Sequence, residues 1–206
     1  DHLSGAIEIV KRYNVKNISN NMIDHTTPET QELFKQVKEN KINIIESNKG
    51  QQLRLGTAIY ANLLWPDDNS WNRKNGNWQA YLDDFNDSSQ VMTIKYDKVL
   101  FMMTGDAGVK ILERITTDPI FLQDIANSEY RILKVSHHGS KDGSSEKFLD
   151  ILKPHLAVIS LGKENTFGHP HIETLEALRE RNIPVLRTDQ IGHIEIISDG
   201  KKVWTK

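Results

Sequence analysis

Histidines and acidic residues gather in a few short motifs of this chain. Five of its eight histidines fall in three of them, and a fourth motif supplies a carboxylate. The motifs are Asp1-His2, Thr104-Gly105-Asp106, His137-His138-Gly139-Ser140 and Gly168-His169-Pro170-His171. Imidazole nitrogens and carboxylate oxygens without thiolates suit divalent metals such as zinc, manganese or iron. The motifs therefore indicate a metal site.

The carboxylate of Asp106 is the natural bridge between two ions, because each of its oxygens can bind one of them. Two ions roughly 3.5–4 Å apart generate a hydroxide and stabilise the attacking and leaving oxygens of an ester displacement. Ser140, Lys141 and the start of a helix predicted at Ser144 can together hold an anion such as phosphate. This chemistry is that of a metal-dependent esterase or phosphodiesterase.

The elements that must position these motifs alternate regularly in the second half of the chain. Strands are predicted at 99–104, 131–135, 156–160 and 184–186, with helices at 107–115, 119–126, 144–153 and 172–182. Three of the motifs follow the carboxyl end of a strand, and ligands of open α/β sheets bind at that edge. We therefore expect Asp106, the 137–138 pair and the 168–171 loop to converge.

The first half reads as helices and short strands. Helices are predicted at 4–13 and from Pro28, with Thr27 as the N-cap, and strands at 15–19, 42–46, 52–55, 58–64 and 90–96. Residues 48–50 are expected to turn strand 42–46 into strand 52–55, and residues 193–198 and 201–204 to form a hairpin. A polar loop, 66–88, carries Trp71, Trp78 and Tyr81. The pattern predicts an α/β fold with mixed sheets.

Composition limits the classes of protein to consider. The 206 residues are 37% hydrophobic and carry a net charge of −2, which fits a single domain over 1–206 and excludes a strongly basic nucleic-acid surface. The absence of cysteine excludes thiol catalysis and cysteine-based zinc fingers. Apolar runs reach only about five residues, too short to span a membrane. We expect a soluble protein, with the cytoplasm favoured.

In their order, the motifs resemble the metallo-β-lactamase-fold hydrolases. Within that superfamily they are most similar to the C-terminal hydrolase domain of the ComEC competence protein family and its stand-alone relatives. The resemblance rests on DHLSGAIE, MMTGDAG, ILKVSHHGSKDGSS, LAVISLGKENTFGHPHIETLEAL and VLRTDQIGHIEI. It implies an αββα sandwich with a dinuclear site, holding zinc or manganese, at one edge.

The resemblance also implies roles for individual residues. Asp1 and His2 match the end of the superfamily's H-x-H-x-D-H motif and would bind one metal. Asp106 would bridge the two ions, and His138 would bind metal while His137 faces the substrate.

In the later motifs, His169 and His171 would flank the leaving group or complete the metal shell. Asn165, Arg187 and Asp189 would support that loop, and Arg187 would also meet substrate charge. Since the two histidines expected before Asp1 and the first strands are absent, we expect a longer parent protein that supplies them.

Three functions remain open. The first is a phosphodiesterase, with DNA as the first candidate substrate, acting through a metal-bound hydroxide with His137 and His169 as catalytic groups and Ser140, Lys141, His171 and Arg187 as substrate ligands. The second is hydrolysis of a smaller ester, of a phosphocholine-esterase or lactonase kind. The third is a catalytically inactive binding module. Steep salt dependence of binding favours the first, and the absence of bound metal favours the third. The sequence leaves the oligomeric state unknown.

Overall fold

The computed structural model describes residues 2–20, 27–67 and 85–206. The chain divides into two compact units, Asp1–Ser47 and Asn48–Lys206. Whether the two units together form the single domain predicted over 1–206 stays a prediction.

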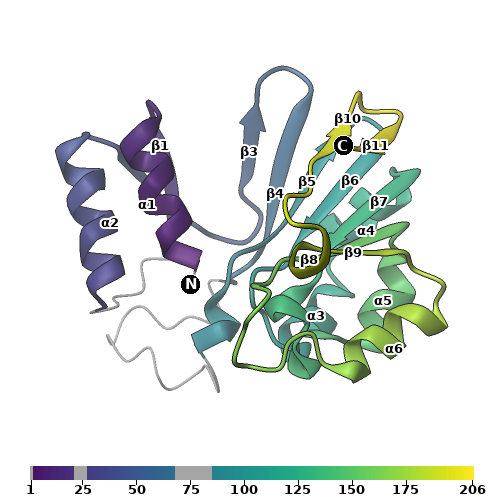
Figure 1. The fold of residues 1–206 in the computed structure, drawn as a ribbon. Coiled ribbons are helices and arrows are strands. Elements are labelled where there is room, and N and C mark those ends of the chain that lie inside the picture. Colours follow the sequence, from purple (N-terminus) through teal and green to yellow (C-terminus); the bar gives the residue numbers. More distant parts are fainter. Residues whose placement is uncertain (1, 21–26, 68–84) are drawn as a thin grey trace. The chain divides into compact units, whose positions relative to one another are not determined.

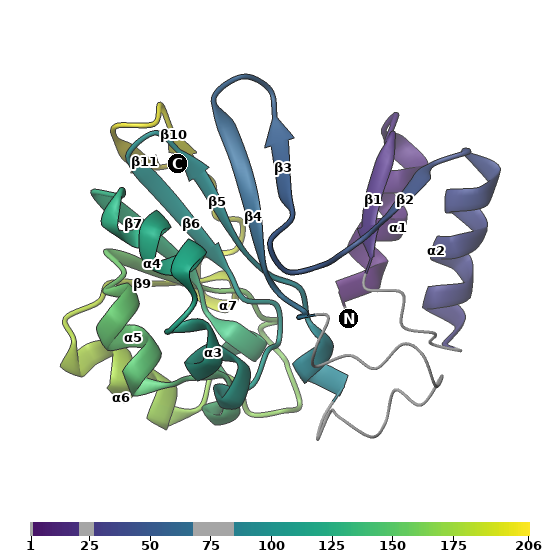
Figure 2. The same cartoon turned by 180° about the vertical axis from the view of Figure 1, so that it is seen from behind.

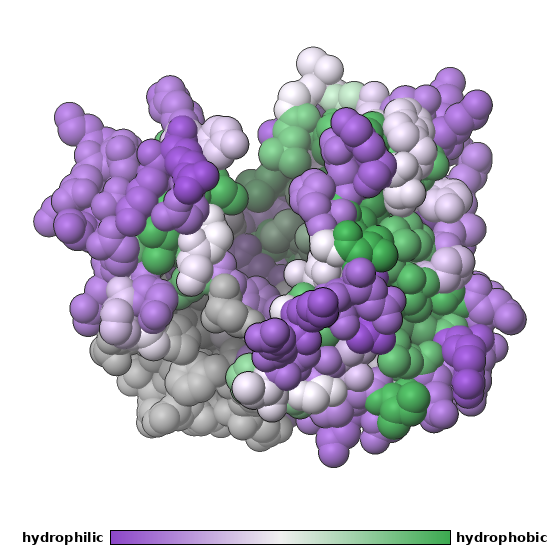
Figure 3. Space-filling view, in the orientation of Figure 1, coloured by the Kyte–Doolittle hydropathy of each residue, from purple (hydrophilic) through white to green (hydrophobic). Residues whose placement is uncertain are grey.

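The first unit pairs two amphipathic helices with a short parallel sheet. Its elements are α1 (His2–Arg12), β1 (Asn17–Asn20), α2 (Pro28–Glu39) and β2 (Asn43–Glu46) (Figure 1). Ile7 and Val10 of α1 pack with Leu33 and Val37 of α2, because helical spacing brings these apolar residues onto one face of each helix. Thr27 caps α2 as predicted, its hydroxyl accepting from the Thr30 N–H. The outer surface of the unit is mostly hydrophilic on the face drawn in Figure 3.

In the described part of the second unit, one mixed sheet of seven strands positions the chemistry. Its strands, in spatial order, are β3 (Gln52–Leu55), β4 (Ile59–Trp65), β5 (Val91–Tyr96), β6 (Val99–Met103), β7 (Tyr130–Lys134), β8 (Leu156–Ile159) and β9 (Val185–Arg187). Strands β3 to β6 pair antiparallel, and β6 to β9 pair parallel. The predicted α/β class with a mixed sheet is confirmed.

The two faces of this sheet have different partners. In β6, Leu100 and Met102 pack with the helices, whereas Val99 and Phe101 pack with the terminal hairpin, because side chains alternate along a strand. The helices are α3 (Val109–Ile115), α4 (Pro119–Ala126), α5 (Glu146–Leu152) and α6 (Ile172–Glu180), and the hairpin strands are β10 (Ile196–Ser198) and β11 (Val203–Thr205) (Figure 2). A short α7 (Thr188–Ile191) follows β9. None of the helices in the described ranges is long and apolar enough to cross a membrane.

Parallel pairing brings the ends of β6, β7 and β8 to one edge of the sheet. The register aligns Met103 of β6 with Lys134 of β7, and Lys134 with Val158 of β8. Directly after these strands come residues 104–106, the short 3-10 helix η4 (Ser136–Gly139) and the loop that contains residues 168–171. The edge therefore collects three of the four sequence motifs.

Two local predictions are wrong. Residues 48–50 do not join a hairpin, since β2 pairs with β1 in the first unit and β3 pairs with β4 in the second. Helix α5 begins at Glu146 with Ser145 as its N-cap, the Ser145 hydroxyl accepting from the Phe148 N–H. Two consecutive serines are equally good caps by residue type, and the Ser144 hydroxyl instead bonds with the Thr174 hydroxyl at 3.1 Å.

A buried polar network fixes one corner of the sheet to α4. The ammonium of Lys95 donates to the carbonyls of Asp97 and Asn127. Nearby, the carboxylate of Asp124 accepts from Asn62 and Thr93. Burial lowers the pKa of Lys95, opposed by the negative charge of Asp124. The network satisfies buried polar groups and lies apart from the histidine motifs in the sequence.

Candidate functional site

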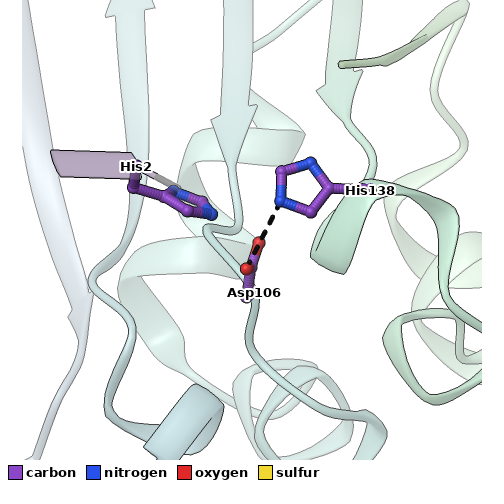
Figure 4. Close-up of side chains that lie close together, drawn as sticks. All are labelled: His2, Asp106 and His138. Atoms are coloured by element: carbon purple, nitrogen blue, oxygen red, sulfur yellow. Dashed lines mark ion pairs between the residues drawn. The ribbon is translucent and has the colours of Figure 1, made fainter. Parts of the chain in front are cut away.

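Asp106 and His138 face each other at the carboxyl edge of the sheet. Asp106 follows β6 and His138 follows its parallel neighbour β7. His138 Nε2 lies 3.6 Å from Asp106 Oδ2 (Figure 4). On the other side of the ring, His138 Nδ1 lies 2.6 Å from the Ser160 carbonyl oxygen. Because a carbonyl only accepts, Nδ1 donates, and the neutral ring carries its lone pair on Nε2, toward Asp106.

This arrangement fits a metal ligand. Histidines that bind metals commonly donate their other ring N–H to a carbonyl or carboxylate, which fixes the tautomer and the ring orientation. A lone pair and a carboxylate oxygen that face each other need a proton or a cation between them. The Asp106 carboxylate raises the pKa of His138, and the Ser160 carbonyl adds to this effect, whereas burial opposes it. One imidazole nitrogen and one carboxylate suit zinc or manganese, and Asp106 and His138 would hold such an ion.

The backbone that carries the histidine pair is strained. His137 has φ 46° and His138 has φ 52°, both in the left-handed region. For residues with side chains this conformation costs roughly 1–2 kcal/mol each. Hydrogen bonds to the segment after β6 hold this backbone in place, since the His137 N–H donates to the Gly105 carbonyl and the Ser136 hydroxyl donates to the Ala107 carbonyl. Strain maintained in this way is typical of functional sites.

Lys134, which the sequence analysis did not single out, lies beside the carboxylate. Its ammonium is 3.9 Å from Asp106 Oδ1 and donates to the Gly105 carbonyl at 3.3 Å. Burial lowers the pKa of Lys134, and the charge of Asp106 opposes that shift. The available signal was a lysine at the end of a strand, three residues before His137 of the His137-His138 motif.

Three histidine rings lie around that of His169. Its ring centroid lies 5.4 Å from that of His137, 6.4 Å from that of His138 and 4.9 Å from that of His171. The Lys141 N–H donates to His171 Nδ1, so a neutral His171 carries its proton on Nε2. Burial, and then the neighbouring histidines beginning with His171, lower the pKa of His169.

Gly139 lets the two histidine loops meet. It has φ 83°, and its carbonyl accepts from the His171 N–H at 3.0 Å. A Cβ added at Gly139 would lie 2.6 Å from Pro170 Cβ. A residue with a side chain would therefore force the loops apart.

The remaining predicted site residues have the following positions. The Ser140 hydroxyl is buried and accepts from the Asp142 N–H inside its own turn, and Lys141 is exposed. Asn165 accepts from the His169 N–H and donates to the His169 carbonyl. Arg187 makes a two-point ion pair with Asp189.

The predicted residues of the N-terminal motif and the long loop lie in the first unit or outside the described residues. His2 begins α1 in the first unit. Asp1, Trp71, Trp78 and Tyr81 lie outside the described residues. Their roles, and those of the residues above, stay predictions.

The second unit is thus a mixed α/β fold with a His/Asp pair that has the chemistry of metal ligands. No family model matches the chain. It is 29% identical over 195 residues to ComE operon protein 3 of Bacillus subtilis, which covers 95% of this chain and 23% of that protein. It is 31% identical to Recombination protein 2 of Haemophilus influenzae and 30% identical to Competence protein ComA of Neisseria gonorrhoeae, each over 54% of this chain and over 13% and 16% of the relative.

The chain therefore spans less than a quarter of the length of these homologous proteins. Among solved structures, it resembles a protein from Parabacteroides distasonis assigned provisionally as a metal-dependent hydrolase. That likeness has a TM-score of 0.44 at 11% identity and covers 87% of this chain and 79% of the other.

Proposed function

We propose that the chain is a metal-dependent hydrolase of the metallo-β-lactamase superfamily that cleaves phosphodiesters, with DNA as the first candidate substrate. The observation that carries the proposal is the Asp106–His138 pair, in which the Ser160 carbonyl turns the His138 Nε2 lone pair toward a carboxylate. The names of two homologues, a recombination protein and a competence protein, favour a nucleic-acid substrate over a small ester.

In this proposal, Asp106 and His138 hold a divalent cation and belong to a site for two ions, zinc or manganese. A divalent cation supplies Lewis-acid activation of water and stabilises charge on a phosphoryl group. Lys134 keeps the Asp106 carboxylate oriented through its ammonium, 3.9 Å from Oδ1.

The other histidines handle protons at the leaving oxygen. In the proposal, the pair His137 and His169, whose ring centroids are 5.4 Å apart, supplies the proton that the leaving oxygen takes up when its bond to phosphorus breaks. His171 donates from Nε2, because its Nδ1 is occupied by the Lys141 N–H. Ser140, Lys141 and Arg187 contact the substrate, with Lys141 as the exposed cation for phosphate.

Metal content tests this function most directly. Elemental analysis of the purified chain, loaded with manganese or zinc, is paired with cleavage of a single-stranded oligonucleotide. Asp106→Asn and His138→Asn should each lower metal affinity by at least about 10-fold, because even the loss of groups that only orient a ligand costs 10- to 100-fold. His193→Asn, at an exposed histidine of the same unit, should change neither measurement. No bound metal in the unaltered protein after loading would overturn the proposal.

Salt dependence separates phosphodiester cleavage in a polynucleotide from hydrolysis of a small ester. Binding of a polynucleotide releases counterions from its phosphates, so affinity should fall steeply between low and moderate salt. A small neutral ester should bind almost independently of salt. Turnover confined to the small ester would contradict the proposed substrate.

A further inference from the structure

An exposed aromatic ring lies beside the histidine cluster. Phe167 is 75% exposed, and its ring stacks on that of His169 with centroids 5.8 Å apart and planes at 26°. His169 in turn contacts the rings of His137 and His138. Phe167 is therefore two ring contacts from the Asp106–His138 pair, with most of its surface in water.

The loop that presents this ring is held at both ends. Asn165 makes two hydrogen bonds to the backbone of His169, at 2.9 and 3.0 Å. Upstream, the Leu161 N–H and carbonyl both bond to the Thr188 hydroxyl at 2.8 Å. Because the backbone is fixed before any ligand arrives, little entropy is lost when the ring is used for binding.

A cation lies near the same cluster. Lys141 is exposed, and its N–H is anchored to His171 Nδ1 at 3.0 Å. The His171 ring stands 4.9 Å from that of His169, on which Phe167 stacks. An exposed aromatic ring and an exposed lysine, whose backbone N–H bonds to the same histidine cluster, match the two parts of a nucleotide, its base and its phosphate.

We propose that Phe167 is a stacking platform for an unpaired base adjacent to the scissile phosphate. This inference rests on the proposed function and narrows its substrate to single-stranded nucleic acid. A base within a duplex already has neighbours on both faces, whereas an unpaired base offers a free face to an aromatic side chain.

Fluorescence of 2-aminopurine in a single-stranded oligonucleotide tests the platform, since stacking on an aromatic ring quenches it. Phe167→Ala should raise the Kd of the metal-loaded protein about 5- to 100-fold and reduce the quench, from the usual strength of base–aromatic stacking. Phe167→Trp should retain both. KM for cleavage should rise in Phe167→Ala while metal affinity is unchanged.

Trp204→Ala provides the matched control. Trp204 is an exposed aromatic of β11, in the hairpin whose Gly200 carbonyl accepts from the Lys98 N–H just before β6 starts. It therefore lies at the end of the strand away from Asp106. This variant should bind and cleave like the unaltered protein.

The outcomes separate the inference from the function on which it rests. If the unaltered protein cleaves the oligonucleotide and Phe167→Ala has the same Kd and KM, the platform is refuted and the proposed function stands. If no metal binds but the quench depends on Phe167, the hydrolase proposal fails and the platform stands as a binding site. Absence of oligonucleotide binding, or an equal effect of Phe167→Ala on duplex binding, overturns the inference.

Discussion

Replacing Gly139 by alanine tests whether the two histidine loops need a residue without a side chain where they meet. Gly139 has φ 83°, and the added Cβ would lie 2.6 Å from Pro170 Cβ. The left-handed backbone costs alanine roughly 1–2 kcal/mol, and overpacking a tight contact costs about 1–3 kcal/mol. Lower entropy of the unfolded chain offsets about 0.4–1 kcal/mol. We expect the free energy of unfolding to fall by about 2–4 kcal/mol.

Three other glycines of the same unit separate the two causes. At Gly56, φ is 76° and the space is open, so alanine there measures the backbone effect alone. At Gly143, φ is outside the left-handed region but a Cβ would lie 2.6 Å from the Ser136 carbonyl oxygen, which measures the steric effect alone. Gly162 has neither constraint, and alanine there should stabilise by up to about 1 kcal/mol.

Urea unfolding followed by circular dichroism gives the four free energies under one condition. The loss at Gly139 should exceed the losses at Gly56 and Gly143, and Gly162→Ala should show none. If Gly139→Ala is no less stable than Gly56→Ala, the steric contact with Pro170 does not exist in solution. A residue without a side chain would then not be required where the two loops meet.

Three further predictions concern groups away from the histidine cluster. Lys95→Met should lower the free energy of unfolding by about 2 kcal/mol, because it removes two partly buried, charged hydrogen bonds to the Asp97 and Asn127 carbonyls. Urea unfolding measures this. Burial, and then the charge of Arg131, lower the pKa of His155. The unfolded chain therefore binds more protons than the folded chain below about pH 6.5, and stability is lost as pH falls through that value. In His155→Phe, the free energy of unfolding measured between pH 5 and 8 should lack the contribution of His155 to its pH dependence. The Arg181 guanidinium lowers the pKa of Asp150 through a two-point contact, so Arg181→Gln should raise that pKa toward its ordinary value in an NMR titration, and an unchanged pKa would refute the contact.

The convergence of Asp106 and His138 could be predicted from sequence because it depends on chain topology. Helices between the strands at 99–104 and 131–135 indicate a crossover, and a crossover makes neighbouring strands parallel. The carboxyl ends of parallel strands then meet whatever the details of packing. Observed β6 and β7 begin and end within one residue of these predicted strands.

Other parts of the site could not be predicted, because the decisive atoms have no signature in residue type. Every residue has a carbonyl, and only the pairing of β8 with β7 brings that of Ser160 to His138. A lysine near a strand end is equally compatible with solvent exposure, which hid the contact of Lys134 with Asp106. The exposure of Phe167 depends on how its loop is braced, and an apolar residue in a loop is by type as easily buried.

The hydrogen bond from His138 to the Ser160 carbonyl cannot be removed by substituting residue 160, because its acceptor is a main-chain atom. All twenty amino acids present the same main-chain oxygen at position 160, so no substitution of that side chain deletes the acceptor. A saturation mutagenesis scan would therefore score residue 160 as tolerant even if the orientation of His138 depends on it. The dependence would show itself only through changes that displace the end of β8, such as an insertion or deletion between Ile159 and Leu161. Residue 160 can therefore tolerate every substitution in such a scan while its main-chain oxygen still sets the orientation of the His138 ring.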